Sequence, residues 1–205
     1  MSFMIGHKFP ATTVTTVMAD GSINDSFSVA DHGKGCMTVV FFYPLDFTFV
    51  CPTEILAFDK AVKEFEKRGC KIVGASIDSH FSHIAWRNTE LKKGGIGPVG
   101  FPLISDMERK LSSELGILAP GGVTYRASYL IDKDGVVRHM VINDLPLGRS
   151  VEEMLRMVDA LAFHEENGEV CPANWHSGDE AIKPTSESTG AYLAKKHGKS
   201  PASAA

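Results

Sequence analysis

Cys51 occupies a position where a cysteine can act as a nucleophile. It follows a continuous apolar run at 37–43 across a short loop and stands directly before Pro52. Proline is favoured at the first position of a helix, and an amphipathic pattern begins here, so Cys51 is predicted to lie at a helix N-terminus. Unpaired backbone N–H groups and the positive end of the helix dipole favour a thiolate there. The position therefore favours a reactive thiol over the buried, inert thiol that is the commoner fate of cysteine.

The other three cysteines carry weaker signals. Cys36 and Cys70 lie in or beside strand patterns and are expected to be inert, whereas Cys171 lies far along the chain. No two cysteines are spaced as Cys-x-x-Cys, which argues against a zinc knuckle and a thioredoxin-type motif. In a reducing compartment, a cysteine pair that is distant in sequence is more often catalytic or transient than structural.

Ionisation of a thiol does not by itself make a fast enzyme. At about pH 7.4 a thiol with an ordinary pKa of about 8.5 is only about 7% ionised. Lowering that pKa by about two units raises the ionised fraction roughly twelve-fold, but intrinsic nucleophilicity falls roughly six- to ten-fold. A fast enzyme must therefore stabilise the transition state with donors aimed at the attacked atom. The Thr48 hydroxyl, from the same loop, and the Arg126 guanidinium, just before the apolar run at 127–131, are the expected donors.

The elements that must position these residues follow from hydrophobic patterns. Alternating patterns at 14–18 and 27–29 predict an N-terminal β-hairpin. Buried strands are predicted at 37–43, 71–77 and 101–105, and a second hairpin at 127–131 and 136–142 around an Asp-Lys-Asp-Gly turn. Strands that alternate with helices and end in a hairpin indicate a three-layer α/β domain.

Four main helices are predicted between and after these strands. The helix that starts near Cys51 ends before Gly69. Its apolar face comprises Ile55, Phe58, Val62 and Phe65. Further helices are predicted at 80–93, from a cap at Asp106 to Gly116, and from a capping box at Ser150. The inner face of the last comprises Val151, Leu155, Val158 and Leu161.

A change in composition predicts two parts, a domain at 1–167 and a C-terminal arm at 168–205. The segment 172–190 is polar and turn-rich, and no core-forming pattern follows until a short stretch at 191–194. Such a segment has no core of its own and either stays mobile or docks on another surface.

Composition and motifs exclude several classes of function. The net charge of −4 argues against nucleic-acid binding, and no apolar run approaches the roughly 20 residues of a membrane span. The N-terminal segment shows no secretory signal, so a cytoplasmic location is expected. A phosphate loop and a dinucleotide fingerprint are both lacking, so no cofactor is expected and reducing power must come from another protein. His80 and His83 have helical spacing but lack further ligands, so no metal site is expected.

Two segments resemble a known family. Residues 42–54 read Phe-Tyr-Pro-Leu-Asp-Phe-Thr-Phe-Val-Cys-Pro-Thr-Glu and carry the P-x-x-x-T-x-x-C signature of the peroxiredoxins. Residues 168–175, around Cys171, look like the resolving-cysteine segment of the typical two-cysteine group, which includes the peroxidase subunit of bacterial alkyl hydroperoxide reductase. Segments 73–80, 125–132 and 144–150 are similar to further family segments in the same order, so the resemblance covers nearly the whole chain.

The resemblance implies a thioredoxin-like fold and assigns roles near the nucleophile. Cys51 would be the peroxidatic cysteine, Thr48 and Arg126 would hold the peroxide and polarise its O–O bond, and Pro44 would shield the sulfur from water.

Two further charged residues match the family pattern. Glu54 would orient the arginine, and Arg149 would be the family's second arginine near the site. For both residues an ordinary surface charge is the alternative interpretation.

The resemblance also implies a reaction cycle and partners. Hydrogen peroxide or an organic hydroperoxide would oxidise Cys51 to a sulfenic acid, which Cys171 of a partner subunit would trap as an intersubunit disulfide. The expected assembly is a homodimer, commonly built up to a decamer, with local unwinding of the first helical turn during disulfide formation. A thioredoxin-like protein or a flavoprotein disulfide reductase would regenerate the thiols.

Two other functions remain as alternatives. A holdase chaperone would not depend on Cys51. A cysteine hydrolase would need a histidine base with an orienting Asn or Asp, and no histidine segment is placed for that role.

Overall fold

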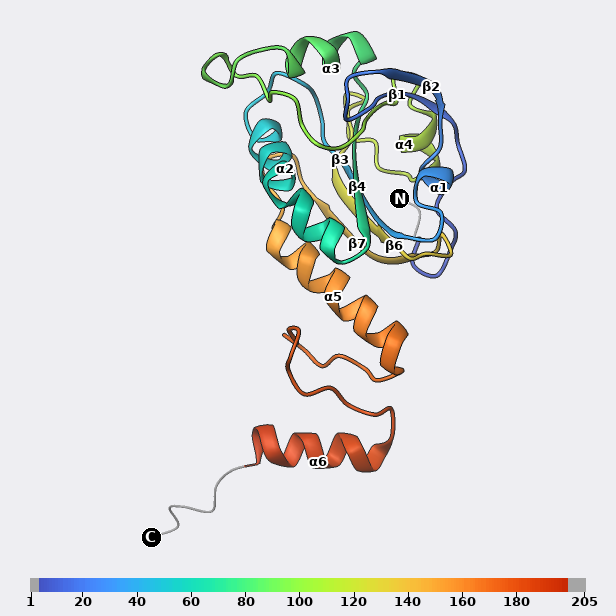
Figure 1. Ribbon diagram of the computed structural model, residues 1–205, viewed down its shortest axis with the longest axis vertical. Coiled ribbons are helices and arrows are strands. Elements are labelled where there is room, and N and C mark those ends of the chain that lie inside the picture. The colour runs from blue at the N-terminus through green and yellow to red at the C-terminus, as the bar shows by residue number, and fades with distance from the viewer. Residues whose placement is uncertain (1–3, 199–205) are drawn as a thin grey trace. The chain divides into compact units, whose positions relative to one another are not determined.

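The computed structural model describes residues 4–198 and contains a seven-stranded sheet (Figure 1). The strands are β1 (Val14–Val17), β2 (Ile23–Phe27), β3 (Met37–Phe42), β4 (Cys70–Ser76), β5 (Leu103–Ser105), β6 (Arg126–Ile131) and β7 (Val137–Asn143). They lie in the order β2-β1-β5-β4-β3-β6-β7, in which β3, β4 and β5 are parallel and the remaining pairs are antiparallel. The central position of β3 between β4 and β6 decides which residues meet at its end.

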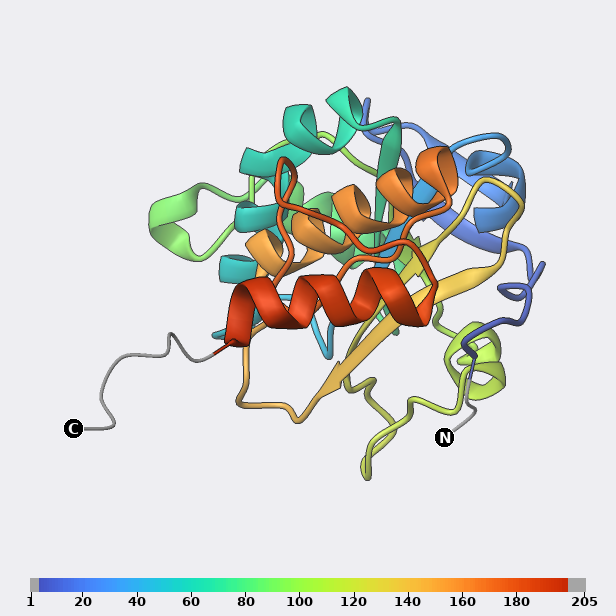
Figure 2. The ribbon, with the colours of Figure 1, turned by 90° about the horizontal axis from the view of Figure 1, so that it is seen from below.

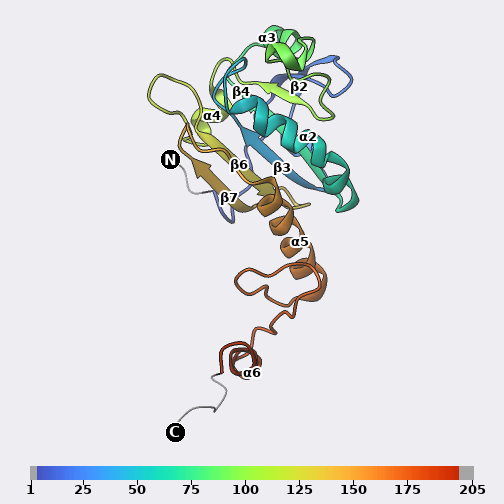
Figure 3. The ribbon, with the colours of Figure 1, turned by 90° about the vertical axis from the view of Figure 1, so that its left-hand side faces the viewer.

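Helices cover both faces of the sheet. The helices of the described chain are α1 (Val29–His32), α2 (Cys51–Lys67), α3 (His80–Arg87), α4 (Lys110–Glu114), α5 (Val151–Asn167) and α6 (Ser186–His197), with a 3₁₀ turn at Leu91–Lys93. Helix α2 lies in front of the sheet in Figure 3, and Figures 1 and 2 show α1 and α4 on the other face of the sheet. This is the three-layer α/β architecture predicted from the alternation of strands and helices.

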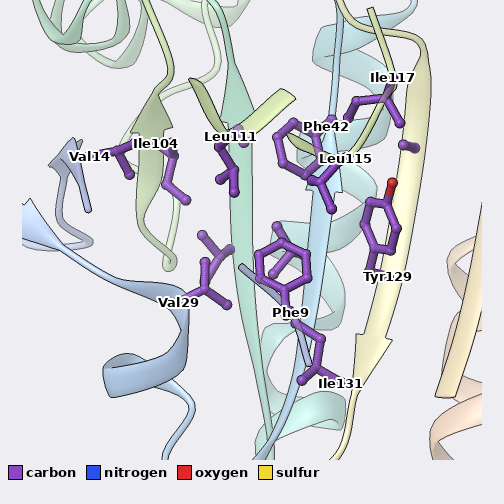
Figure 4. Packing of buried hydrophobic residues seen from close by; sticks show 14 of the residues in the cluster. Phe9, Val14, Val29, Phe42, Ile104, Leu111, Leu115, Ile117, Tyr129 and Ile131 are labelled. Atoms are coloured by element: carbon purple, nitrogen blue, oxygen red, sulfur yellow. The ribbon is translucent and has the colours of Figure 1, made fainter. Parts of the chain in front are cut away.

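The apolar run of β3 is buried along its whole length because its two faces serve two cores. Val40 and Phe42 point into a cluster on the α1 and α4 side, where they meet Leu111 and Tyr129 (Figure 4). Phe41 points to the other side. There it stacks on Phe58 of α2, with ring centroids 4.2 Å apart and planes at 12°.

Helix α2 begins at Cys51, as the sequence predicted. Pro52 occupies the first turn, and Gly69 follows the helix with a φ of 64°. Of the predicted apolar face, Ile55, Phe58 and Phe65 are buried, and Val62 is half-buried. No side chain caps the N-terminus, where Val50 is the cap residue. The first turn of α2 therefore lacks the stabilisation that a capping side chain gives.

Two elements, one near the N-terminus and one in the middle of the chain, have bounds that differ from the predicted ones. The second strand of the hairpin lies at Ile23–Phe27 rather than 27–29, because the Ser28 side chain caps α1. The helix predicted at 80–93 ends at Arg87, because the chain turns back over Trp86. The Trp86 Nε1 group donates to the carbonyl of Gly94 at 2.7 Å, which fixes this turn.

The helix that was predicted to follow a cap at Asp106 is α4, which begins only at Lys110. Asp106 still serves as its cap, because its carboxylate accepts from the backbone N–H groups of Leu111 and Ser112 at 3.1 and 2.8 Å. The Asp106 carboxylate therefore caps the N-terminus of this helix although Asp106 itself precedes it in the chain.

The inner face of α5 was predicted only in part. Val158 is buried, as are Met154 and Ala160, which the pattern did not single out. Val151, Leu155 and Leu161 are half-buried.

The chain divides into two compact units between Val158 and Asp159. The predicted arm at 168–205 falls within the second unit. Within this unit, part of the arm packs on the end of α5, which precedes it. The Trp175 side chain is 2% exposed, with its ring centroid 4.9 Å from that of Phe163, and Val170 and Ile182 form an antiparallel bridge.

No helix within residues 4–198 combines the length and the apolar composition that a bilayer span requires.

Replacement of Phe58 tests how α2 is held on the sheet. Phe58→Ala is expected to lower the free energy of unfolding by about 3–5 kcal/mol, because it removes a buried ring that stacks on Phe41. Urea denaturation followed by circular dichroism measures the loss. Lys63→Ala, on the exposed side of the same helix, is the matched control and should change stability by less than about 0.5 kcal/mol. Equal losses in the two variants would contradict this packing.

Candidate active site

The sulfur of Cys51 lies at the start of α2, where the loop from β3 ends. The side chain is buried, at 1% exposure. Pro44, at the beginning of the loop, is also buried, and Thr48 is half-buried. The Thr48 hydroxyl donates to the carbonyl of Leu45 at 2.8 Å, so its lone pairs are left to accept a further hydrogen bond.

Arg126 brings a guanidinium to the sulfur from a distant part of the sequence. Its Nη1 group donates to the Cys51 Sγ atom at 3.5 Å and to the Glu54 Oε2 atom at 2.7 Å. Its Nε group donates to the carbonyl of Leu145 at 2.7 Å, which fixes the orientation of the guanidinium plane. Arg126 starts β6, and β6 pairs with β3, so the sheet itself places this side chain beside the loop that follows β3.

Glu54 joins two arginines one turn into α2. Its Oε1 atom accepts from the Arg149 backbone N–H at 2.9 Å and from Arg149 Nε at 2.8 Å. Its Oε2 atom accepts from Arg149 Nη2 at 3.0 Å and from Arg126 at 2.7 Å. The carboxylate is therefore bound by a two-point contact from Arg149 and a single contact from Arg126.

All three charged side chains of this cluster are buried, with 3 to 4% of each side chain exposed. The alternative interpretation of Glu54 and Arg149 as ordinary surface charges is therefore wrong. Two guanidiniums share one carboxylate, so the cluster carries one unbalanced positive charge. A thiolate at Cys51, in contact with Arg126, would balance this charge.

The pKa values of the cluster follow from burial and pairing. Burial alone would raise the pKa of Glu54, but the hydrogen bonds and charge of Arg149, together with Arg126, outweigh it and hold the pKa below its ordinary value. Burial lowers the pKa of Arg149, and its bonds to Glu54 oppose that effect. A guanidinium remains charged throughout the range of protein function.

Further contacts hold Arg149 in place. Its Nη1 group donates to the carbonyl of Ala127 at 2.7 Å and to the hydroxyl of Ser128 at 3.1 Å. Its guanidinium carbon lies 5.5 Å from the centre of the Phe41 ring. Ser128 was missed by the sequence analysis. Its position two residues after Arg126, on the same side of a strand, is the signal that could have indicated it.

Asp46 is a second residue that the sequence analysis missed. It lies in the active-site loop, and its side chain is 1% exposed and paired with His83 at 2.8 Å. The other ring nitrogen of His83 faces the carbonyl of Ile104, so both nitrogens have partners. Within the described residues, no group of three or more His, Cys, Asp or Glu side chains could hold a metal ion.

The remaining cysteines differ in their surroundings. Burial raises the pKa of Cys70 to about 12, which agrees with an inert thiol. Cys171 lies in the second compact unit, where it is half-buried and its sulfur is 3.6 Å from the carbonyl of Ala160. No disulfide joins the four cysteines.

Family models match both parts of the chain. The model described as the AhpC/TSA family matches residues 5–140. The model described as the C-terminal domain of 1-Cys peroxiredoxin matches residues 160–195. The first match contains Cys51, Arg126 and Glu54, and the second contains Cys171.

Individual relatives agree with these matches. The chain is 47% identical over 193 residues to alkyl hydroperoxide reductase C of Buchnera aphidicola, covering 94% of this chain and 98% of that one. It is 48% identical over 193 residues to peroxiredoxin-1 of Gallus gallus, covering 94% and 96%. Among solved structures, the reduced 2-Cys peroxiredoxin of Plasmodium vivax superposes with a TM-score of 0.91 at 41% identity, covering 94% of this chain and all of that one.

These comparisons confirm the thioredoxin-like fold and the peroxiredoxin resemblance. Because the family model covers residues 5–140, and relatives align over 94% of the chain, the chain belongs to the AhpC/TSA family of peroxiredoxins and is a thiol-dependent peroxidase.

Proposed function

We propose that Cys51 is the nucleophile that reduces hydrogen peroxide and organic hydroperoxides. The observation that carries this proposal is the 3.5 Å contact between its sulfur and Arg126, within a buried cluster that has one unbalanced positive charge. The thiolate attacks one peroxide oxygen, an S–O bond forms and the O–O bond breaks. Water or an alcohol leaves, and Cys51 becomes a sulfenic acid.

Arg126 has donors to spare for the substrate. Its Nε and Nη1 groups are engaged by Leu145, Cys51 and Glu54. Its Nη2 group has no acceptor among residues 4–198 and is available for the peroxide oxygens. Fixed donors of this kind stabilise the negative charge that develops on the leaving oxygen.

Thr48 binds the other oxygen of the peroxide O–O bond. Because its own hydrogen is donated to the carbonyl of Leu45, the Thr48 oxygen is free to accept a hydrogen bond from the hydroperoxide O–H group. Pro44, buried at the start of the loop, limits access of water to the sulfur. Glu54 and Arg149 hold the Arg126 guanidinium in the orientation that attack requires.

Cys171 completes the cycle as the resolving cysteine. It attacks the sulfenic acid of Cys51 on a partner subunit and releases water, which leaves an intersubunit disulfide. Two such disulfides relate the subunits of a homodimer, and further assembly to a decamer is expected. The first turn of α2 has no side-chain cap, which supports local unwinding around Cys51 during this step.

The disulfide is returned to thiols by a protein partner, either thioredoxin or a flavoprotein disulfide reductase. No cofactor is assigned to this chain. The cytoplasmic location remains a prediction from the sequence, as do the domain bounds at 1–167 and 168–205.

Replacement of the two cysteines tests these assignments. Cys51→Ser is expected to abolish peroxide consumption, which would also exclude a peroxidase role for another thiol. Cys171→Ser should still consume one equivalent of peroxide per chain but form no disulfide-linked dimer, as judged by non-reducing electrophoresis after stoichiometric peroxide. A wild-type protein that stays monomeric in that experiment would contradict the intersubunit disulfide. A chaperone activity, in contrast, would survive Cys51→Ser.

Replacement of Glu54 tests the buried charge cluster. Glu54→Gln is expected to cost about 3–5 kcal/mol of stability at neutral pH, because it leaves two buried guanidiniums without a carboxylate. Since the pKa of Glu54 is lowered in the folded protein, its stabilising effect is complete above the ordinary value of 4.5 and is lost as the pH falls through the lowered value. The difference in the free energy of unfolding between wild type and variant should therefore be constant near neutral pH and should decrease below pH 4.5.

The measurement is chemical denaturation across a pH series. Glu64→Gln on the same helix is the matched control, since Glu64 pairs with Lys67 and Arg68 near the surface. Its effect at neutral pH should be much smaller than that of Glu54→Gln, because ion pairs near the surface contribute little to stability. If the difference in unfolding free energy between wild type and Glu54→Gln did not change as the pH falls, the ionised carboxylate would not be the source of the stability.

A further inference from the structure

The active-site loop has a buried carboxylate that the proposed chemistry does not use. Asp46 lies between Pro44 and Thr48. Its Oδ1 atom accepts from the Tyr43 hydroxyl at 3.0 Å. Its Oδ2 atom accepts from the Ser82 hydroxyl at 2.8 Å and lies 2.8 Å from His83 Nδ1. Every contact of this carboxylate comes from outside the residues that are proposed to touch peroxide.

The partners of His83 determine its charge. Its Nε2 atom lies 3.1 Å from the carbonyl oxygen of Ile104. A carbonyl only accepts hydrogen bonds, so Nε2 must carry a proton. Its Nδ1 atom faces a carboxylate that already accepts from two hydroxyls, so Nδ1 also donates. Both nitrogens are then protonated, and the imidazolium neutralises the Asp46 carboxylate.

Other groups support this arrangement. Burial, together with the charge of Asp46, raises the pKa of Tyr43 well above its ordinary value, so the Tyr43 hydroxyl keeps the proton that it donates. The backbone N–H of Asp46 donates to the Asp78 Oδ2 atom at 2.9 Å. Burial and the nearby charge of Asp46 raise the pKa of Asp78, and the hydrogen bonds that Asp78 accepts from Ser76 and from the Asp46 backbone oppose this effect.

The same helix also holds the loop through aromatic contacts. The Trp86 ring centroid, one turn after His83 on α3, lies 5.6 Å from that of Phe47 and 6.1 Å from that of Tyr43. Phe47 has a positive φ of 54°, which a phenylalanine adopts only when its surroundings impose it. The loop between Asp46 and Thr48 is therefore fixed in a strained shape by its contacts with α3.

We propose that Asp46 and His83 form a buried ion pair that positions the active-site loop, and with it the Thr48 oxygen, for attack on peroxide. Both are positioning residues rather than catalytic residues. This inference rests on the proposed role of Thr48 beside Cys51. Because the pair anchors the loop ahead of α2, its loss impairs the peroxide step, whereas the later unwinding of the first helical turn does not depend on it.

The test measures two steps separately in the full-length protein. Stopped-flow assays give kcat/KM for hydrogen peroxide and the rate of disulfide formation after oxidation. Asp46→Asn and His83→Gln are each expected to lower kcat/KM by about 100-fold, as for a reacting group misplaced by about 1 Å. The rate of disulfide formation should stay within about twofold of wild type, since α2 itself is unchanged. The double variant should be no worse than either single variant, because both remove the same pair.

A pair of conservative variants keeps the test decisive if a charge variant does not fold. Tyr43→Phe removes one donor to Asp46 and should lower kcat/KM roughly threefold to tenfold. Tyr129→Phe is the matched control, because the buried Tyr129 hydroxyl has no partner among the described residues, and it should leave kcat/KM unchanged. Equal kcat/KM in these two folded variants would overturn the proposal. So would an equal slowing of both steps in a folded Asp46→Asn variant.

The charge of His83 is measured directly by ¹⁵N NMR of the histidine ring at neutral pH. Two protonated ring nitrogens are expected, and a single one would overturn the ion pair. A failure of the proposed function would look different. In that case wild type would lack peroxidase activity, or Cys51→Ser would retain it, whatever the state of His83.

Discussion

Two arginines and one carboxylate, buried together beneath the start of α2, form the interaction on which this site depends. Arg126 and Arg149 share Glu54, and the remaining positive charge lies against the Cys51 sulfur. Burial strengthens the electrostatic effect of this charge on the sulfur, because little water screens it. It also makes the cluster intolerant of substitution, since loss of the carboxylate or of a guanidinium leaves a buried charge without a partner. The proposed activation of the thiol and the expected contribution to stability thus depend on the same three side chains.

The sheet explains how such a cluster assembles from distant parts of the chain. The crossover that places β6 beside β3 brings Arg126 to the loop that follows β3. The loop after β7 brings Arg149 to the same place. Both the backbone N–H and the side chain of Arg149 donate hydrogen bonds to Glu54. The hairpin of β6 and β7 therefore delivers both arginines, while α2 delivers the thiol and the carboxylate.

Local patterns predicted most of this fold. The apolar run of β3, Pro52 and the apolar face of α2 all lie where expected, because their signals depend on neighbours in the sequence. Contacts made across the fold were less accessible. The burial of Glu54 and the partnership of Asp46 with His83 depend on sheet order, which no local pattern encodes. The helix predicted at 80–93 starts where expected but ends at Arg87, because Trp86 binds the carbonyl of Gly94 and turns the chain.

The boundary inside α5 separates two kinds of chemistry. Every side chain that contacts Cys51 or Glu54 belongs to the first compact unit, and Cys171 belongs to the second. A change confined to residues 159–198 would therefore leave in place the side chains that bond to Cys51 and Glu54.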